Sequence, residues 1–241
     1  MRRYYYDLHL HSCLSACADN DMTPYNIAGM AKISGLDIVA LTDHNSTANC
    51  PAFFRACEEY GLTALGGMEL TTSEDIHAVC LFPTLEDTMA FGEEIDAHRT
   101  KIKNKKAIFG EQYLIGDDDE VIGEDEYLLS VATDISIEDV AEYVSRHHGF
   151  CYPAHIDRDS YSVTAVLGTF PLHLPFSIFE LHDGKREAEF RERYGLGDKY
   201  MICSSDAHTL DGIRDGEYFI EMEEEFSDAN AIREALFRKF R

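Results

Sequence analysis

Short apolar runs alternate along the chain with segments of helical periodicity. Several of these runs are continuously apolar, which is typical of parallel strands that are covered on both faces. The pattern predicts seven strands, which are Tyr4–His9, Asp37–Leu41, Thr63–Gly67, His77–Phe82, Gly149–Pro153, Ser177–Leu181 and Tyr200–Ser204. Between most of them lies a segment long enough for a helix.

The best-marked predicted helix begins at Thr23 and Pro24 and runs to Ser34, because threonine caps helices and proline fits their first turn. The other predicted helices are Pro51–Tyr60, Ile137–His148, Asp183–Tyr194 and Asp228–Lys239. Repeated β-α units with little else favour an α/β fold of the TIM-like (β/α) barrel type over an open sheet. We therefore expect residues 1–241 to form a single barrel domain.

One stretch, residues 85–135, departs from this alternation. Glu86 to about Lys106 has the pattern of a long polar helix, and an Asp-rich turn at residues 116–120 is flanked by two short strand-like runs. We interpret 85–135 as a helix-plus-hairpin cap inserted between the fourth and fifth strands. The cap is either a solvated cover of mixed charge or a lid that selects substrates.

The charge balance is strongly acidic, with 21 Lys and Arg against 45 Asp and Glu and a net charge of −24. Proteins that bind the phosphate backbone present a basic surface. The sequence therefore argues against long nucleic acid as a partner and favours a small phosphorylated substrate. Bound cations would still make a site locally positive.

No apolar run approaches the roughly 20 residues of a membrane-spanning helix, and the N-terminal residues do not resemble a signal peptide. The seven cysteines include no CxxC pair, which is typical of reduced thiols. These features predict a cytoplasmic protein without a membrane partner. They do not predict an oligomeric state.

Histidines and carboxylates gather where predicted strands end. His9 and His11 are two residues apart at a strand end, so their side chains share a face, and Asp206 and His208 repeat that spacing at another strand end. His44 follows the second strand. Imidazoles and carboxylates without thiolates suit Zn, Mn or Fe at sites left open for water.

The remaining candidate ligands have similar positions. Glu69 follows the third strand, His77 begins the fourth, His155 follows the fifth, and Asp19 lies in the loop after the first. Catalytic residues of a barrel gather at the C-terminal ends of its strands. Each residue alone has an ordinary explanation, but their joint placement predicts one polynuclear metal site.

The order of these motifs resembles the PHP (polymerase and histidinol phosphatase) family. The motifs are HxH near the N-terminus, TDH, GxE, a nearby His, a later His and a terminal DxH, and they cover about residues 4–82 and 149–215. The resemblance implies a distorted (β/α)7 barrel that holds two or three divalent metal ions, and most known catalytic members are phosphoesterases.

The resemblance also implies three metal sites that share ligands. The first is formed by His9, His11, Glu69 and Asp206. The second shares Glu69 and is completed by His77 and His155. The third is formed by Asp19, His44 and His208. The family usually has HSxxSDG where this chain has HSCLSACADND, so Asp21 is an alternative to Asp19.

Other residues are expected to support the site. Asp43, within LTDH, would hold a neighbouring imidazole or the loop. Arg158 follows His155 by three residues and either clamps a substrate phosphate or forms a structural ion pair. Lys185 and Arg214 are further candidates for a phosphate clamp, and His182 is a candidate for the rim of the site.

The function expected from these residues is hydrolysis of small-molecule phosphoesters, such as a nucleotide or a sugar or amino-alcohol phosphate, by a metal-activated hydroxide. Residues with expected catalytic roles are Glu69, Asp206, His208 and Arg158. Two alternatives are a carbon–nitrogen hydrolase of the amidohydrolase kind and a non-catalytic metal-binding module.

Overall fold

The computed structural model describes residues 1–223, 226 and 228–240. Its main sheet has six strands in the order β10-β1-β2-β3-β4-β7, and smaller sheets pair β8 with β9 and β5 with β6. The strands are β1 Arg2–Leu10, β2 Ile38–Leu41, β3 Thr63–Thr71, β4 His77–Phe82, β5 Tyr113–Ile115, β6 Val121–Glu124, β7 Phe150–Pro153, β8 Ile178–Leu181, β9 Tyr200–Cys203 and β10 Phe219–Met222. All seven strands predicted from the sequence are confirmed, whereas β5, β6 and β10 add to them.

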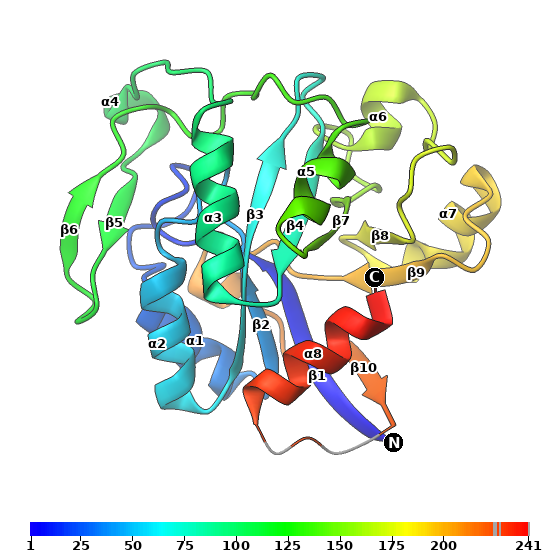
Figure 1. The fold of residues 1–241 in the computed structure, drawn as a ribbon, viewed down its shortest axis with the longest axis horizontal. Coiled ribbons are helices and arrows are strands. Elements are labelled where there is room, and N and C mark those ends of the chain that lie inside the picture. The colour runs from blue at the N-terminus through cyan, green and yellow to red at the C-terminus, as the bar shows by residue number, and fades with distance from the viewer. Residues whose placement is uncertain (224–225, 227, 241) are drawn as a thin grey trace.

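The sheet is mixed and curled rather than a uniform ring of parallel strands (Figure 1). β1, β2 and β3 are parallel, but β4 runs antiparallel to both β3 and β7. The reversal follows from the sequence, because five residues between β3 and β4 are too few for a crossover helix. β8 and β9 pack against the same core as the main sheet through Ile178 and Ile202, but they form a separate sheet, so a complete (β/α)7 barrel remains a prediction.

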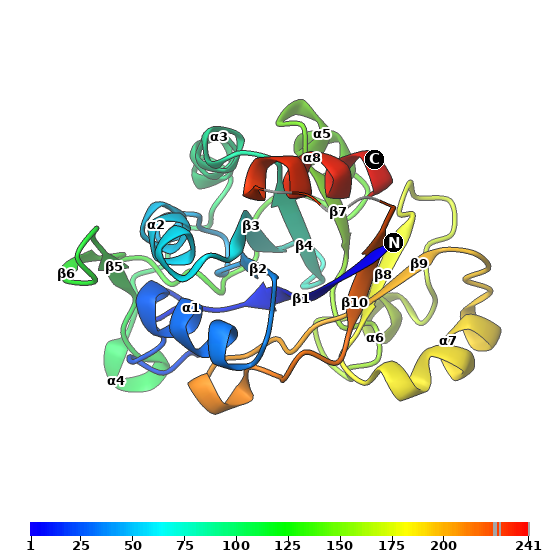
Figure 2. The same cartoon turned by 90° about the horizontal axis from the view of Figure 1, so that it is seen from below.

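Helices surround the sheet (Figures 1 and 2). They are α1 Pro24–Ile33, α2 Cys50–Tyr60, α3 Leu85–Asp96, α4 Lys106–Phe109, α5 Val140–Arg146, α6 Val163–Leu167, α7 Glu187–Tyr194 and α8 Ala229–Phe240, with 3-10 turns η1 Gly184–Arg186 and η2 Leu210–Gly212. The predicted cap of α1 is confirmed, since the Thr23 side chain accepts a hydrogen bond from Asn26 N–H. Among the described residues, no helix has the length and apolar character needed to cross a membrane.

The interior of the curled sheet forms one of the apolar cores. Its strand residues include Leu8, Leu65 and Ile202, and Leu236 and Phe237 of α8 pack against them. A second core lies between the sheet and helices α3 and α5. These cores hold the strands rigidly, so that the polar residues at the strand ends are presented from a fixed frame.

The cap differs from the expected 85–135 insertion at its start. The predicted long helix ends at Asp96, and α3 packs into the core with Phe91 and Ile95 fully buried. The helix does not continue because Arg99 leaves it to bridge Thr133 and to pair with Asp125. The predicted hairpin is confirmed as β5 and β6.

The cap is tied to the end of the sheet where the candidate ligands lie. The side-chain amide of Asn45 donates to the carbonyls of Leu129 and Val131 at 2.7 and 2.9 Å, and its oxygen accepts from Thr71 N–H at 2.8 Å. Thr133 N–H donates to the Thr71 carbonyl at 2.9 Å. Residues 97–135 are therefore fastened next to β3, two residues from Glu69.

Candidate metal centre

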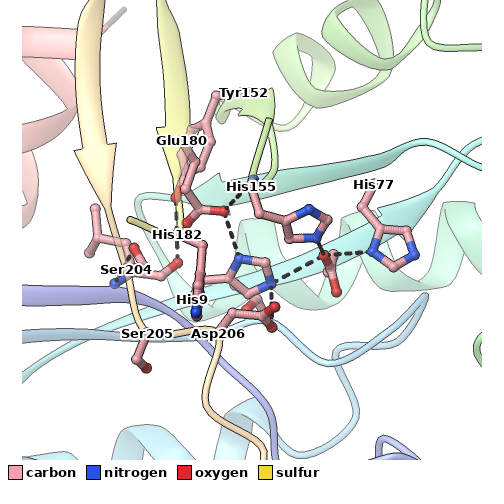
Figure 3. A network of polar contacts seen from close by, with 12 residues as sticks. His9, His77, Tyr152, His155, Glu180, His182, Ser204, Ser205 and Asp206 are labelled. Atoms are coloured by element: carbon pink, nitrogen blue, oxygen red, sulfur yellow. Dashed lines mark hydrogen bonds and ion pairs between the residues drawn. The ribbon is translucent and has the colours of Figure 1, made fainter. Parts of the chain in front are cut away.

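The candidate metal ligands form a cluster around the buried carboxylate of Glu69, which five imidazoles approach. Its Oε1 lies 2.8 Å from His77 Nδ1, 3.0 Å from His155 Nε2 and 3.2 Å from His9 Nε2. Its Oε2 lies 3.1 Å from His44 Nδ1 and 3.2 Å from His11 Nε2. Figure 3 shows His9 of β1, His77 of β4 and His155, which follows β7, converging on one point.

Sheet register brings these side chains together. In the β3–β4 hairpin Thr71 pairs with His77, so His77 lies on the rim beside Glu69 although it begins its strand. His44 forms a parallel bridge with Glu69 directly after β2. The hairpin packs closely at Gly67, where an added Cβ would lie 2.4 Å from the Cys80 carbonyl oxygen, so this position requires glycine.

Asp206 supplies the second carboxylate, just after β9. Its Oδ1 lies 3.2 Å from His11 Nε2 and 3.5 Å from His9 Nε2, and its Oδ2 lies 2.8 Å from Arg158 Nη1. Asp206 has a φ of +53° and His155 a φ of +29°. Positive φ is uncommon for residues other than glycine and is often found at functional sites, so the fold holds these two side chains in place at some conformational cost.

The donor set fits divalent metal ions. Several buried atoms that point into the cluster form no hydrogen bond, namely His9 Nε2, His11 Nε2, His44 Nδ1, His77 Nδ1 and Asp206 Oδ1. Buried polar atoms normally have partners, and converging lone pairs of this kind are satisfied by a cation. Three groups have ligand atoms close enough to share an ion: His9, His11, Glu69 and Asp206; His44, Glu69 and His77; and His11, His44 and His208.

When no metal is bound, protonated imidazoles offset the negative charge of the buried carboxylates in the cluster. Burial alone would lower the pKa of His11, but the carboxylates of Asp206 and Glu69, each 3.2 Å from its Nε2, raise that pKa to about 9. Burial would raise the pKa of Asp206, but the nearby His9 and His11 hold it below its usual range. The pKa of His208 falls to about 4, first through burial and then through the charge of His11. Metal ions would replace the imidazole protons.

The structure brings most of the predicted ligands together, and their assignment as ligands stays a prediction. His155 touches Glu69, although it belongs to none of the three groups. Asp19 is different, because its side chain is exposed and lies outside the groups. Its N–H donates to the His208 carbonyl at 2.9 Å, which keeps Asp19 beside the third group. Asp21 is also exposed.

Asp43 lies under the first loop, as expected for a supporting residue. It accepts hydrogen bonds from the hydroxyls of Ser12 at 2.6 Å and Ser15 at 2.7 Å. The Ser15 hydroxyl in turn lies 3.1 Å from His11 Nδ1. Asp43 therefore holds the loop directly and orients His11 through Ser15.

Sequence analysis missed Glu180, a buried carboxylate on β8. Its Oε2 accepts hydrogen bonds from His9 Nδ1 and from the His155 main-chain N–H, each at 2.9 Å. Figure 3 shows Glu180 on the opposite side of the His9 ring from the other carboxylates. The signal was present in the sequence, because a glutamate interrupts an otherwise apolar strand.

A row of basic side chains leads away from Asp206. Arg158, which pairs with Asp206, places its Nη2 3.2 Å from His182 Nδ1. Arg214 approaches the same ring, with its Nη2 3.3 Å from both ring nitrogens. Burial, followed by the charges of Arg158 and Arg214, lowers the pKa of His182, so this ring is neutral at pH 7. Lys185 is exposed on η1 and is not part of the row.

Solved structures share this fold at low sequence identity. A Bifidobacterium adolescentis protein assigned as a metal-dependent phosphoesterase is 20% identical, with a TM-score of 0.59. The alignment covers 98% of this chain and 96% of that protein. An amidohydrolase from Chromobacterium violaceum with bound sulfate is 19% identical, with a TM-score of 0.57 and 96% coverage of both chains. No curated protein sequence matched the chain.

A third comparison corrects the expectation about long nucleic acid. Endonuclease Q, in complex with a 27-mer duplex substrate that has an abasic lesion at the active site, is 19% identical, with a TM-score of 0.62. This chain aligns over 99% of its own length but spans only 57% of that protein. The expectation was wrong because net charge sums over the whole surface, whereas charges beyond a Debye length of about 8 Å from the site are largely screened.

A family model provides the assignment. The PHP domain model matches residues 7–170, which is more than half of the chain and includes all the candidate ligands up to His155. Together with the phosphoesterase and endonuclease folds, this match supports a metal-dependent hydrolase that acts on phosphoesters. The chain belongs to the PHP domain family.

Proposed function

We propose that this protein hydrolyses phosphate esters of small molecules with two or three divalent metal ions, Zn, Mn or Fe. The observation that carries the proposal is the approach of five imidazoles to the buried Glu69 carboxylate. A carboxylate with both oxygens surrounded in this way can bridge two metal ions. The imidazole and carboxylate donors suit each of these metals.

We assign the ligands as three overlapping sets. His9, His11, Glu69 and Asp206 hold the first ion. Glu69 would also help to hold a second ion, together with His77 and His155. His44 and His208 hold a third, with Asp19 as the loop ligand that lies beside His208. Metal ions bound there supply an activated water at neutral pH and neutralise phosphoryl oxygens.

The protein's own side chains orient the substrate. Arg158 presents its guanidinium beside Asp206, where it can donate to two oxygens of a phosphate. At neutral pH the lowered pKa values leave His208 neutral and Asp206 ionised. In our proposal both residues therefore act as ligands, and they do not donate a proton to the leaving oxygen.

The choice of a small substrate rests on the fold shared with the Bifidobacterium phosphoesterase, which extends over nearly the whole of both chains. The chain spans 57% of Endonuclease Q. A duplex with an abasic site still belongs in the same assay, because the fold is shared.

The experiment combines elemental analysis with hydrolysis assays on one preparation. We expect two to three ions per chain and turnover of 4-nitrophenyl phosphate that is lost in His9→Ala and Asp206→Ala. His173→Ala, whose side chain is 71% exposed, should behave like the wild type. Turnover of a cyclic amide in place of the phosphate ester would support the amidohydrolase alternative. Bound metal without any turnover would support the non-catalytic alternative.

Cleavage of the abasic duplex at a higher kcat/KM than any small phosphate ester would overturn the small-substrate proposal while leaving the metal centre intact. Absence of metal from protein purified without chelators would overturn the ligand assignment itself.

A further inference from the structure

β6 is an open edge strand of the cap. Its sheet contains only β5 and β6, and β5 lies between β6 and the body of the molecule (Figures 1 and 2). The other edge of β5 is occupied, because Tyr113 N–H donates to the Cys13 carbonyl at 2.9 Å. The Asn49 side chain also bonds to the main chain of Tyr113 and Ile115. Among the described residues, no segment pairs with the outer edge of β6, so its outward main-chain groups can accept another strand.

Apolar side chains are exposed on this edge strand. Val121 is 55% exposed and Ile122 is 65% exposed, and both are β-branched residues that favour strands. Proteins usually protect an exposed edge with charges, prolines or a covering segment. β6 contains no proline, and its single charged residue, Glu124, lies at its end and contacts Lys106 of α4. The composition of β6 therefore favours pairing with a further strand.

Charges of opposite sign flank the two ends of β6. The turn before it, residues 117–120, has the sequence DDDE. Asp118 of this turn is exposed, and its carboxylate has no ion-pair partner within the described part of the chain. At the other end, Asn104 N–H donates to the Glu126 carbonyl at 2.9 Å, so the exposed Lys105 lies where β6 ends. One edge thus has an acidic end and a basic end.

A second copy of the same edge matches these charges. In antiparallel pairing about a two-fold axis, the start of β6 in one copy lies beside the end of β6 in the other. The acidic turn of each copy then faces the lysines of its partner. Because a net charge of −24 makes two copies repel each other, self-association needs a basic region at the contact, and residues 99–106 hold five of the 21 basic residues.

We propose that two copies of this protein associate through β6, which joins their hairpins into one four-stranded sheet in the order β5-β6-β6-β5. Asp118 of each copy lies opposite Lys105 of the other. The interface contributes no candidate metal ligand, although it lies close to the loop that carries Asp19. In the cap, an added Cβ at Gly110 would lie 2.5 Å from the carbonyl oxygen of Ala16, which belongs to that loop.

The association is expected to be weak, because the register irregularity of the hairpin between Val121 and Gly123 leaves a short edge for a second strand. Sedimentation velocity of the full chain should show a dimer as the concentration rises through the micromolar range. Ile122→Asp, which puts a charge into the paired edge of both copies, should weaken association by about 100-fold or more. Leu172→Asp, at a residue 53% exposed outside the cap, is the matched control and should leave association unchanged.

Charge reversal tests the two-fold arrangement. Lys105→Glu alone and Asp118→Lys alone should each weaken self-association by about tenfold or more, because both contacts across the axis become repulsive. Mixing the two variants should restore association as a heterodimer, since each charge then meets an opposite one at both contacts. The double variant, Lys105→Glu with Asp118→Lys, should associate with itself as the wild type does.

A wild type that stays monomeric at several hundred micromolar would overturn the proposal. So would an unchanged dimer in Ile122→Asp, or a mixture of the two charge variants that fails to associate while each keeps the thermal unfolding of the wild type. Hydrogen exchange gives a second readout. The main-chain amides of β6 should become protected as the wild-type concentration rises and should stay unprotected in Ile122→Asp, and exchange that is independent of concentration in the wild type would contradict pairing through β6.

Discussion

The carboxylate of Glu180 lies 2.9 Å from Nδ1 of His9, on the side of the ring opposite the candidate metals. The same oxygen accepts the His155 N–H, at a residue whose φ is +29°. Because Nδ1 donates to Glu180, Nε2 keeps its lone pair for a metal ion once its proton leaves. One buried carboxylate thus sets the tautomer of one ligand and the backbone position of another.

Replacing Glu180 should therefore weaken metal binding without removing a ligand. Glu180→Leu is expected to lower metal affinity by about 10- to 100-fold, the usual effect of losing the partner of a metal-bound histidine. Glu180→Gln retains an acceptor and should lose less. Competition with a chelator measures both, and unchanged affinity in Glu180→Leu would contradict the assigned role.

Loss of Glu69 should affect more than one ion. Glu69→Gln removes the bridging charge that five imidazoles approach, so we expect at most one ion per chain and a fall in kcat of at least about 1,000-fold, since two-metal catalysis would be lost. Glu93→Gln, an exposed change on α3, is the matched control. Full metal content in Glu69→Gln would argue against a bridge.

Arg158 should act mainly on substrate binding. Arg158→Met is expected to lower kcat/KM for 4-nitrophenyl phosphate by about 10- to 100-fold. Arg158→Lys should lower it by less, because lysine keeps the charge but cannot form the bidentate hydrogen bonds of a guanidinium. Metal content should not change. Arg238→Met, on the exposed face of α8, serves as the control. If Arg158→Met lost metal together with activity, the role of Arg158 would be a structural ion pair that holds Asp206 in place.

Metal-free protein should lose stability as pH rises. The raised pKa of His11, about 9, means that the folded state holds a proton that the unfolded chain releases near 6.5. This contribution, on the order of 3 kcal/mol, is complete below pH 6.5 and is lost between about pH 6.5 and 9. Urea unfolding at several pH values should show the decline, and His11→Asn should reduce it, with the remainder due to His9, whose pKa is also raised. Saturating metal should remove the decline, because the ion replaces the proton.

The loop carboxylates can be separated by mutation. Asp19 is hydrogen-bonded through its backbone to His208, whereas Asp21 is linked to Asn26 of α1 through its carbonyl. Asp19→Ala should reduce three bound ions to two, with the remaining two unaffected, and Asp21→Ala should not. Elemental analysis of both variants decides this, and the reverse result would assign Asp21 as the ligand.

The hydrophobic pattern in the sequence was sufficient to place seven strands but missed β10 at the edge of the main sheet. Buried strands and capped helices leave local signals, such as Thr23 and Pro24 at the start of α1. The pattern was not sufficient for pairing, since the direction of β4 depends on the short connection after β3 and not on any residue within β4. The polar continuation after Asp96 has helical composition, and only the pairing of Arg99 with Asp125 explains why the chain leaves the helix there.

The site was predictable as far as its residues occur at strand ends. His9, His44 and Glu69 follow from spacing, because strand ends meet at one rim. Glu180 did not stand out, because its importance arises from a partner far away in the sequence, His9. A single glutamate in an otherwise apolar strand conflicts with the local hydrophobic pattern, and such conflicts often mark functional residues.

The reversal of β4 has a consequence for how members of this family can diversify. Because β4 runs away from the ligand rim and α3 returns alongside it, the chain arrives back at that rim with residues 97–135, which contribute no strand to the main sheet. This segment can be lengthened, shortened or exchanged while His77 and His155, on either side of it in the sequence, keep their positions. The candidate ligands are thus held by strands and strand ends, whereas the neighbouring residues 97–135 can vary. Substrate preference can therefore change while the ligand residues stay the same.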